Sequence, residues 1–242
     1  MLGFKVLNLK DEKDKNFHYN KNRINKLKLE IEELLKQIKD IDVSEELNSL
    51  LIFERGKERA NLANGYNYIL EAKEINKDTL KELYDILSKD LLDEYSKENM
   101  GKYYRQKDVF ILGTLSRGMY ASLVNDKMDD LFKYINEDND KDIVETFIKS
   151  QIIHYYFVYV HPYFDVNGRT ARTLSMWYQL KQNKPELILF NRGVHINKAE
   201  YKDSIFKCNK GNITPFLVFS LNNLKEELKE IISYEDTTGK KK

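Results

Sequence analysis

The stretch His161-Pro162-Tyr163-Phe164-Asp165-Val166-Asn167-Gly168-Arg169-Thr170-Ala171-Arg172 places a base, a carboxylate, an amide, a glycine and two arginines close together. It follows a strongly apolar run over residues 143–160, and Arg169 opens another helical pattern. The N-terminus of a helix offers unpaired backbone N–H groups and a positive dipole end, which suit phosphate oxygens. The stretch therefore predicts a polyphosphate site at a loop-to-helix junction.

The side chains in this stretch agree with such a site. Gly168 lets the backbone come close to a ligand. Arg169 and Arg172 share one helix face, and cations there oppose the helix dipole unless an anion lies between them. Asp165 is a hard oxygen donor suited to Mg²⁺, and His161 can act as a base near neutral pH. A capping histidine and a solvated arginine pair are the ordinary alternatives, but the combination favours a phosphate site with a metal and a proton acceptor.

The composition is that of a globular protein with one domain and, at most, a smaller helical appendage. The chain has 242 residues, of which 41% are hydrophobic and 33% charged, and its formal net charge of +1 gives no reason to expect a nucleic-acid or membrane partner. The single cysteine, Cys208, fits a reducing cytoplasm. No apolar run is long enough for a membrane span, and we expect no signal peptide.

The hydrophobic pattern predicts a mainly α protein with one small β-hairpin. The first twenty or so residues look polar and irregular, a helical region follows from about Ser44, and 143–160 reads as a buried helix. Two short apolar runs around a glycine-bounded turn, within residues 109–124, predict the hairpin. A stripe of helical spacing is expected to pack on the core or to support a homodimer, which we slightly favour: Ile24, Leu27, Ile31, Leu34 and Ile38.

The stretch resembles the signature of the Fic family, H-P-F-x-[D/E]-G-N-G-R-x-x-R. Tyr163 stands for the usual Phe, and Val166 for the usual Gly. Upstream, His154, Tyr155 and Phe157 are similar to the family's H-Y-x-F segment, and 101–105 to its G-x-Y-R stretch. The positions that match the signature are His161, Pro162, Asp165, Asn167, Gly168, Arg169 and Arg172.

The resemblance implies a Fic-type helical bundle that transfers AMP from Mg-ATP to a Ser, Thr or Tyr hydroxyl of a protein, including possible self-modification. It implies an N-terminal helical region over 1–74, a Fic domain over 75–228 and a tail over 229–242. The hairpin over 109–124, the flap, would hold the target segment by strand addition.

The resemblance also assigns roles to residues. His161 would deprotonate the target hydroxyl, and Asp165 would hold Mg²⁺. Asn167 and the Gly168 backbone would form an anion hole, while Arg169 and Arg172 would bind the β- and γ-phosphates. Tyr201 and Asn209 fall where the family places adenosine contacts.

Two features leave alternatives open. A β-branched Val166 disfavours positive φ, so either the loop keeps negative φ or the turn is distorted and activity falls. The family's inhibitory motif, [S/T]-x-x-x-E-[G/N], has a degenerate match near 44–72 whose Glu54 would pair with Arg172. The alternative functions are a nucleotide-binding regulatory module with little activity, or a Fic transferase that moves UMP, phosphate or another group.

Overall fold

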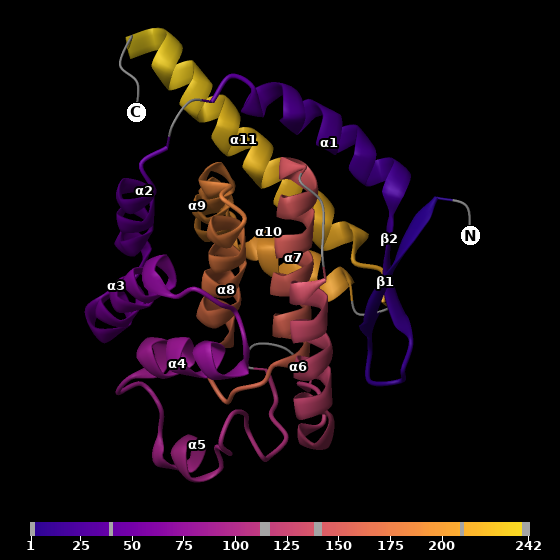
Figure 1. Ribbon diagram of the computed structural model, residues 1–242, viewed down its shortest axis with the longest axis vertical. Helices are drawn as coiled ribbons and strands as arrows, with labels where there is room; N and C mark the ends of the chain where they lie inside the picture. Colours follow the sequence, from indigo (N-terminus) through magenta and orange to yellow (C-terminus); the bar gives the residue numbers. More distant parts are fainter. Residues whose placement is uncertain (1–2, 39–40, 112–116, 138–141, 209–210, 239–242) are drawn as a thin grey trace.

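Two helices joined by the loop 161–166 form the centre of the fold in the computed structural model (Figure 1). They are α7 (Ile143–Val160) and α8 (Asn167–Lys181), and they pack against each other along their length. The structure describes residues 3–38, 41–111, 117–137, 142–208 and 211–238. The mainly helical class predicted from the composition is confirmed.

The central helix α7 is buried on nearly every side, as its unbroken apolar run predicted. It is packed against α8, against α6 (Ala121–Asn136) and against the long C-terminal helix α11 (Thr214–Thr238). Its start is fixed by Asp142, whose side chain accepts hydrogen bonds from the backbone N–H groups of Val144 and Glu145. Such an N-cap satisfies donors that would otherwise be unpaired. The packing of α7 therefore fixes the position of its C-terminal end, at His161.

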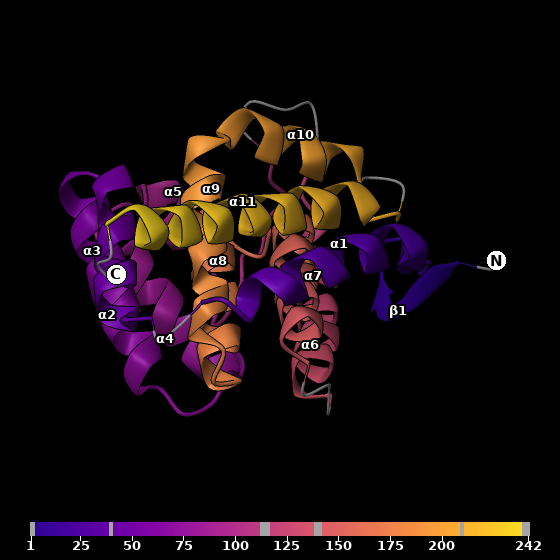
Figure 2. The ribbon, with the colours of Figure 1, turned by 90° about the horizontal axis from the view of Figure 1, so that it is seen from above.

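The apolar stripe near the N-terminus is partnered within the chain. It lies on α1 (Lys21–Leu35), which runs beside α11 in both Figure 1 and Figure 2. Ile24 and Ile31 are buried there, and Leu27 and Leu34 are partly buried against the same core. Our first alternative, packing on the core, is the one the structure has, so the stripe no longer argues for a homodimer. Residues 229–238 continue α11.

The expectation of an irregular N-terminus was wrong, because this segment forms a β-hairpin. Strands β1 (Phe4–Lys10) and β2 (Asn16–Asn20) pair antiparallel. Alternate side chains are buried, Leu7 and Leu9 on one strand and Phe17 and Tyr19 on the other. This period of two is the signal of a half-buried strand, but it covers only two buried side chains on each strand, with Asn8 and His18 between them.

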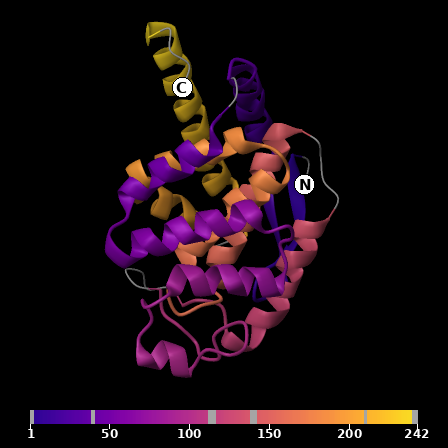
Figure 3. The same ribbon diagram turned by 60° about the vertical axis from the view of Figure 1, so that its left-hand side comes forward.

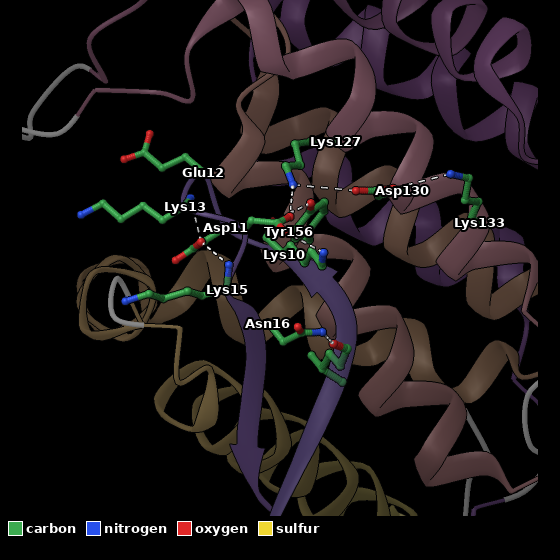
Figure 4. A network of polar contacts seen from close by, with 12 residues as sticks. Lys10, Asp11, Glu12, Lys13, Lys15, Asn16, Lys127, Asp130, Lys133 and Tyr156 are labelled. Carbon is green, nitrogen blue, oxygen red and sulfur yellow. Dashed lines mark hydrogen bonds and ion pairs between the residues drawn. The ribbon is translucent and has the colours of Figure 1, made fainter.

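The polar turn of that hairpin reaches the central helices (Figure 4). The Tyr156 hydroxyl on α7 donates to the Lys10 carbonyl at 2.9 Å. Lys127 on α6 lies 3.9 Å from a carboxylate oxygen of Asp14, and at the same distance from one of Asp130. The hairpin is thus tied to α6 and α7, next to the loop that carries the candidate site.

On the opposite side, α2 (Val43–Leu50), α3 (Gly56–Glu71) and α4 (Lys77–Ser88) are stacked over α8 (Figure 3). A 3₁₀ turn, η1 (Leu51–Phe53), separates α2 from α3. The helix α3 runs without a break through Asn64-Gly65. A Cβ on Gly65 would lie 2.7 Å from Leu87 Cδ2, so the glycine lets α3 and α4 approach closely.

The predicted flap hairpin is confirmed only at its base. Phe110 and Arg117 form an isolated antiparallel bridge, and the Gly118 N–H donates to the Val109 carbonyl. Residues 112–116 lie outside the described residues. The second apolar run, 119–123, is not a strand, because α6 begins at Ala121. There the Asp108 side chain accepts the Ala121 N–H, which starts the helix in place of the expected strand.

Short elements complete the described part of the chain. The turn η2 (Pro185–Leu189) and helices α9 (Phe190–Ile196) and α10 (Lys198–Lys207) lie near α11, and α5 (Glu94–Glu98) precedes the flap. None of the helices that the structure describes is both long enough and apolar enough to cross a membrane.

The contact at Gly65 gives a stability prediction. Gly65→Val should lower the free energy of unfolding by about 1–3 kcal/mol, because the new side chain overpacks the α3–α4 contact. Asn67→Val, an exposed position on the same helix, is the control for the poorer helix propensity of valine. Urea unfolding measures both; equal losses in the two variants would contradict the close-packing role.

Candidate active site

The loop between α7 and α8 begins and ends in the left-handed backbone region. His161, the C-cap of α7, has φ 53° and ψ 61°, and Val166, the N-cap of α8, has φ 64° and ψ 5°. Both conformations are unfavourable for residues other than glycine, and His161 also precedes a proline, which favours an extended backbone. The alternative of negative φ at Val166 is therefore wrong, and the lower activity expected with a distorted turn stays a prediction. Strain of this kind persists only where the surroundings hold it.

The side chain of Asn167 holds the loop from inside. Its amide nitrogen donates to the Tyr163 carbonyl at 2.8 Å, and its oxygen accepts the Tyr163 N–H at 3.0 Å. The ring of Tyr163 is buried and stacks on Tyr84, with centroids 3.5 Å apart. The amide of Asn167 therefore shapes the loop through both of its polar atoms, whereas the resemblance had assigned it to an anion hole.

His161 presents one ring nitrogen to its own helix. Nδ1 lies 3.3 Å from the Val158 carbonyl, and because a carbonyl only accepts, this contact places the proton on Nδ1. The lone pair is then on Nε2. Burial, with a smaller contribution from the charge of Arg105, lowers the pKa of His161 to about 4. The imidazole is therefore neutral at physiological pH and able to accept a proton.

The start of α8 is open to an anion. Val166 gives no side-chain cap, and the first turn holds no acidic residue. The first N–H groups of a helix have no intrahelical partner, so the backbone around Gly168 offers donors. Asp165 is exposed at the same end, and its Oδ1 accepts the Val166 N–H at 2.6 Å. An exposed carboxylate beside a phosphate site fits the usual way of binding Mg²⁺, with one or two protein carboxylates and substrate phosphates.

The arginine that pairs with Glu54 is Arg169. Glu54, at the end of η1, lies 3.6 Å from Arg169 Nε, and Glu58 on α3 pairs with the Nη2 of the same side chain. We had expected Glu54 to pair with Arg172. The difference arises because α3 begins directly after Glu54, which brings Glu58 to the same guanidinium. Arg169, the residue assigned to the β-phosphate, is thus engaged by two carboxylates.

Arg172 belongs to a buried chain of hydrogen bonds instead. It interacts with the Tyr201 hydroxyl, which lies within hydrogen-bond distance, 2.8 Å, of His154 Nε2 on α7. Burial lowers the pKa of His154 to about 3, so its ring is neutral. The structure therefore brings Tyr201 to the second arginine of the stretch. Asn209, the other predicted adenosine contact, lies outside the described residues.

Sequence reasoning missed three residues around this site. Glu58 carried no motif, although its position four residues after Glu54 is one helical turn. Arg105 was noted only within the 101–105 stretch, but its guanidinium is buried against His161. His195 stacks on Phe53, and the charge of Arg172 contributes to its lowered pKa. These neighbours come from distant segments, so spacing along the chain could not reveal them.

Comparison with known proteins agrees with the resemblance. Residues 74–179 match the Fic/DOC family. Protein adenylyltransferase fic-1 of Caenorhabditis elegans is 28% identical over 116 residues, and protein adenylyltransferase Fic of Nematostella vectensis is 32% identical over 97 residues. The matches cover 48% and 38% of this chain but 22% of each relative, so the chain spans about a fifth of the length of these proteins.

Solved structures support the fold over most of the chain. A Fic family protein from Desulfovibrio desulfuricans matches with a TM-score of 0.61 at 20% identity, covering 89% of this chain and 66% of that one. A fragment of Fic-1 from C. elegans matches with a TM-score of 0.62 at 18% identity, covering 90% and 74%. The helical architecture is therefore shared well beyond the region matched by the family.

The left-handed backbone at Val166 predicts an inverted order of stabilities. In a helix, glycine costs about 1 kcal/mol more than alanine, whereas at positive φ the penalty falls on alanine. Val166→Gly should therefore unfold at a higher urea concentration than Val166→Ala. Val124, buried in α6, is the matched control, where the alanine variant should be the more stable. The same order at both positions would show that Val166 is not left-handed in solution.

Proposed function

We propose that this chain is a protein adenylyltransferase, which moves AMP from Mg-ATP to a protein hydroxyl, because residues 74–179 match the Fic/DOC family. The observation that carries the proposal is the loop 161–166, which sets a neutral imidazole, an exposed carboxylate and an uncapped helix N-terminus side by side. The names of the related adenylyltransferases support the same reaction.

In the proposed reaction the hydroxyl oxygen of a Ser, Thr or Tyr attacks the α-phosphorus of ATP. A P–O bond forms to the protein, the bond to the β-phosphate breaks, and pyrophosphate leaves. His161 takes the hydroxyl proton on Nε2, which its Nδ1 contact leaves free. A neutral base of this kind contributes typically 10²–10⁴-fold to a rate.

The negative charge of the transition state falls on groups at the start of α8. The backbone N–H of Gly168 and the guanidinium groups of Arg169 and Arg172 would bind phosphate oxygens, and preorganised donors supply most of the catalysis in such transfers. Asp165 would hold Mg²⁺, which neutralises phosphate charge when bound. The Tyr201 hydroxyl, bonded to Arg172, would keep that arginine oriented.

The acceptor would be a protein segment added as a strand at the base of the flap, where Phe110 bridges Arg117. Strand addition uses main-chain hydrogen bonds, which depend little on the side chains of the added segment. Phe110, 77% exposed beside the bridge to Arg117, offers an apolar surface at that edge. The proposal therefore names the acceptor group, a side-chain hydroxyl, and leaves its protein to be identified by experiment.

Labelling tests the reaction. Incubation with Mg²⁺ and ATP labelled at the α-phosphate should mark the protein itself or an added target, and His161→Ala should lower the labelling rate by on the order of 10³-fold. His18→Ala is the control, because His18 lies on β2 away from the loop. Undiminished labelling in His161→Ala would remove the assigned base.

Arg169 must leave its carboxylate partners to bind a phosphate, which gives the site a built-in brake. We expect measurable basal activity and only a modest gain in Glu54→Gly, because Glu58 still occupies the guanidinium. The double variant Glu54→Gly with Glu58→Gln should be faster by on the order of tenfold, about 1.4 kcal/mol of barrier.

The self-labelling rate measures this brake. Glu71→Gln, at the far end of the same helix α3, should label like the unchanged protein. A large gain from Glu54→Gly alone would mean that Glu54 is the whole brake. No gain in the double variant would mean that the two carboxylates do not restrain Arg169 during turnover.

A further inference from the structure

Arg105 is a buried cation, and its side-chain partners among the described residues are backbone carbonyls. Only 2% of its surface is exposed. Its Nε donates to the His161 carbonyl at 2.8 Å, Nη1 donates to the Lys107 carbonyl at 2.7 Å, and Nη2 donates to the Met119 carbonyl. Burial lowers the pKa of the guanidinium to about 10, so the side chain is still charged at neutral pH. Burying a charge is costly unless its hydrogen bonds are made, and here each nitrogen of the fork has a partner.

The three carbonyls belong to segments with different tasks. His161 starts the loop that carries the proposed base, whereas Lys107 and Met119 lie on either side of the Phe110–Arg117 bridge at the base of the flap. The backbone of Arg105 adds a fourth link, since its N–H donates to the Pro162 carbonyl at 3.0 Å. One residue thus joins both ends of the flap to the left-handed turn at His161.

The packing between these segments is close. A Cβ on Gly118 would lie 3.0 Å from Val109 Cγ2, 3.2 Å from Arg105 Nη2 and 3.3 Å from His161 Cβ. The glycine at the base of the flap therefore sits directly against the side chain of the proposed base. A small shift of either segment would change the distance between His161 and a strand docked on the flap.

We propose that Arg105 is a positioning residue, which fixes His161 relative to the acceptor-binding flap by donating to the carbonyls of His161, Lys107 and Met119. The inference rests on the proposed function, because it concerns the proton transfer from the acceptor hydroxyl to His161. Arg105 touches neither nucleotide nor acceptor in this account. It sets the approach of the two reacting groups, and a misplacement of about 1 Å can cost on the order of 10²-fold in rate.

The variants separate charge from geometry. Arg105→Gln removes the charge and leaves one donor nitrogen in place of three. Arg105→Lys keeps the charge but lacks the planar, forked guanidinium group. Lys149→Gln is the matched control: Lys149 is also buried and also donates to backbone carbonyls, those of Ile135 and Glu137. Each protein is first compared by urea unfolding, so that a general loss of stability is seen in the control as well.

For turnover, we expect Arg105→Gln to lower kcat by on the order of 10²-fold while the KM for ATP changes less than about threefold, because the start of α8 is untouched. Arg105→Lys should recover part of the loss, and Lys149→Gln should keep full activity. An equal fall in kcat in all three variants would overturn the positioning role. So would an effect of Arg105→Gln that appears only as a higher KM for ATP.

A second readout does not depend on transfer. The backbone ¹³C shifts of His161 report its left-handed conformation, and they should move toward ordinary values in Arg105→Gln but stay unchanged in Lys149→Gln. Unchanged His161 shifts in Arg105→Gln would overturn the proposal even if the labelling reaction were absent. If the His161 chemical shifts change in Arg105→Gln but the unchanged protein transfers no AMP, the positioning role is supported and the proposed function is contradicted.

Discussion

The site depends on one short loop that is held in an unfavourable conformation. His161 and Val166 are both left-handed, and each residue in that region costs roughly 1–2 kcal/mol. The bonds of Asn167 to the Tyr163 backbone and of Arg105 to the His161 carbonyl oppose that cost. Because the loop turns so sharply, the end of α7 and the start of α8 meet, and the proposed base comes to lie near the helix N-terminus proposed to bind phosphate.

The rest of the fold keeps this loop in place. α7 is enclosed by α6, α8 and α11, so its end cannot shift without disturbing the core. The close α3–α4 contact at Gly65 brings η1 and the start of α3 toward α8. That arrangement is what allows Glu54 and Glu58 to reach Arg169. The elements that support the site therefore also supply the carboxylates that pair with Arg169.

Much of this organisation could be predicted from the sequence, and the failures have physical causes. The stretch 161–172 carried its signal in consecutive residues, so its loop and the helix that follows could be read directly. The strands β1 and β2 were missed because each alternation is short: Asn8 separates the buried Leu7 and Leu9, and so brief a period of two resembles an irregular segment. The expected second arm of the flap is the start of α6, because Asp108 accepts the Ala121 N–H.

Contacts between distant segments were the hardest to predict. Glu54 was expected beside Arg172 but pairs with Arg169, one helical turn earlier. Which of the two arginines it reaches depends on how α3 packs on α8, and the spacing of residues along the chain does not show this. The hydrogen bonds of Arg105 to three carbonyls could not be predicted either, because every residue has a backbone carbonyl and the sequence does not mark which ones accept. Backbone acceptors and tertiary ion pairs thus account for most of what the motif alone could not supply.

The central claim is that the start of α8 binds the phosphates of ATP. Amide NMR spectra recorded while Mg-ATP is added test it most directly, with the double variant at Glu54 and Glu58 beside the unchanged chain. The account predicts that the largest shifts occur at the N–H groups of Asn167, Gly168 and Arg169, and that they saturate at lower ATP concentration in the double variant. Saturable binding that leaves these three amides unmoved and shifts another region would contradict it.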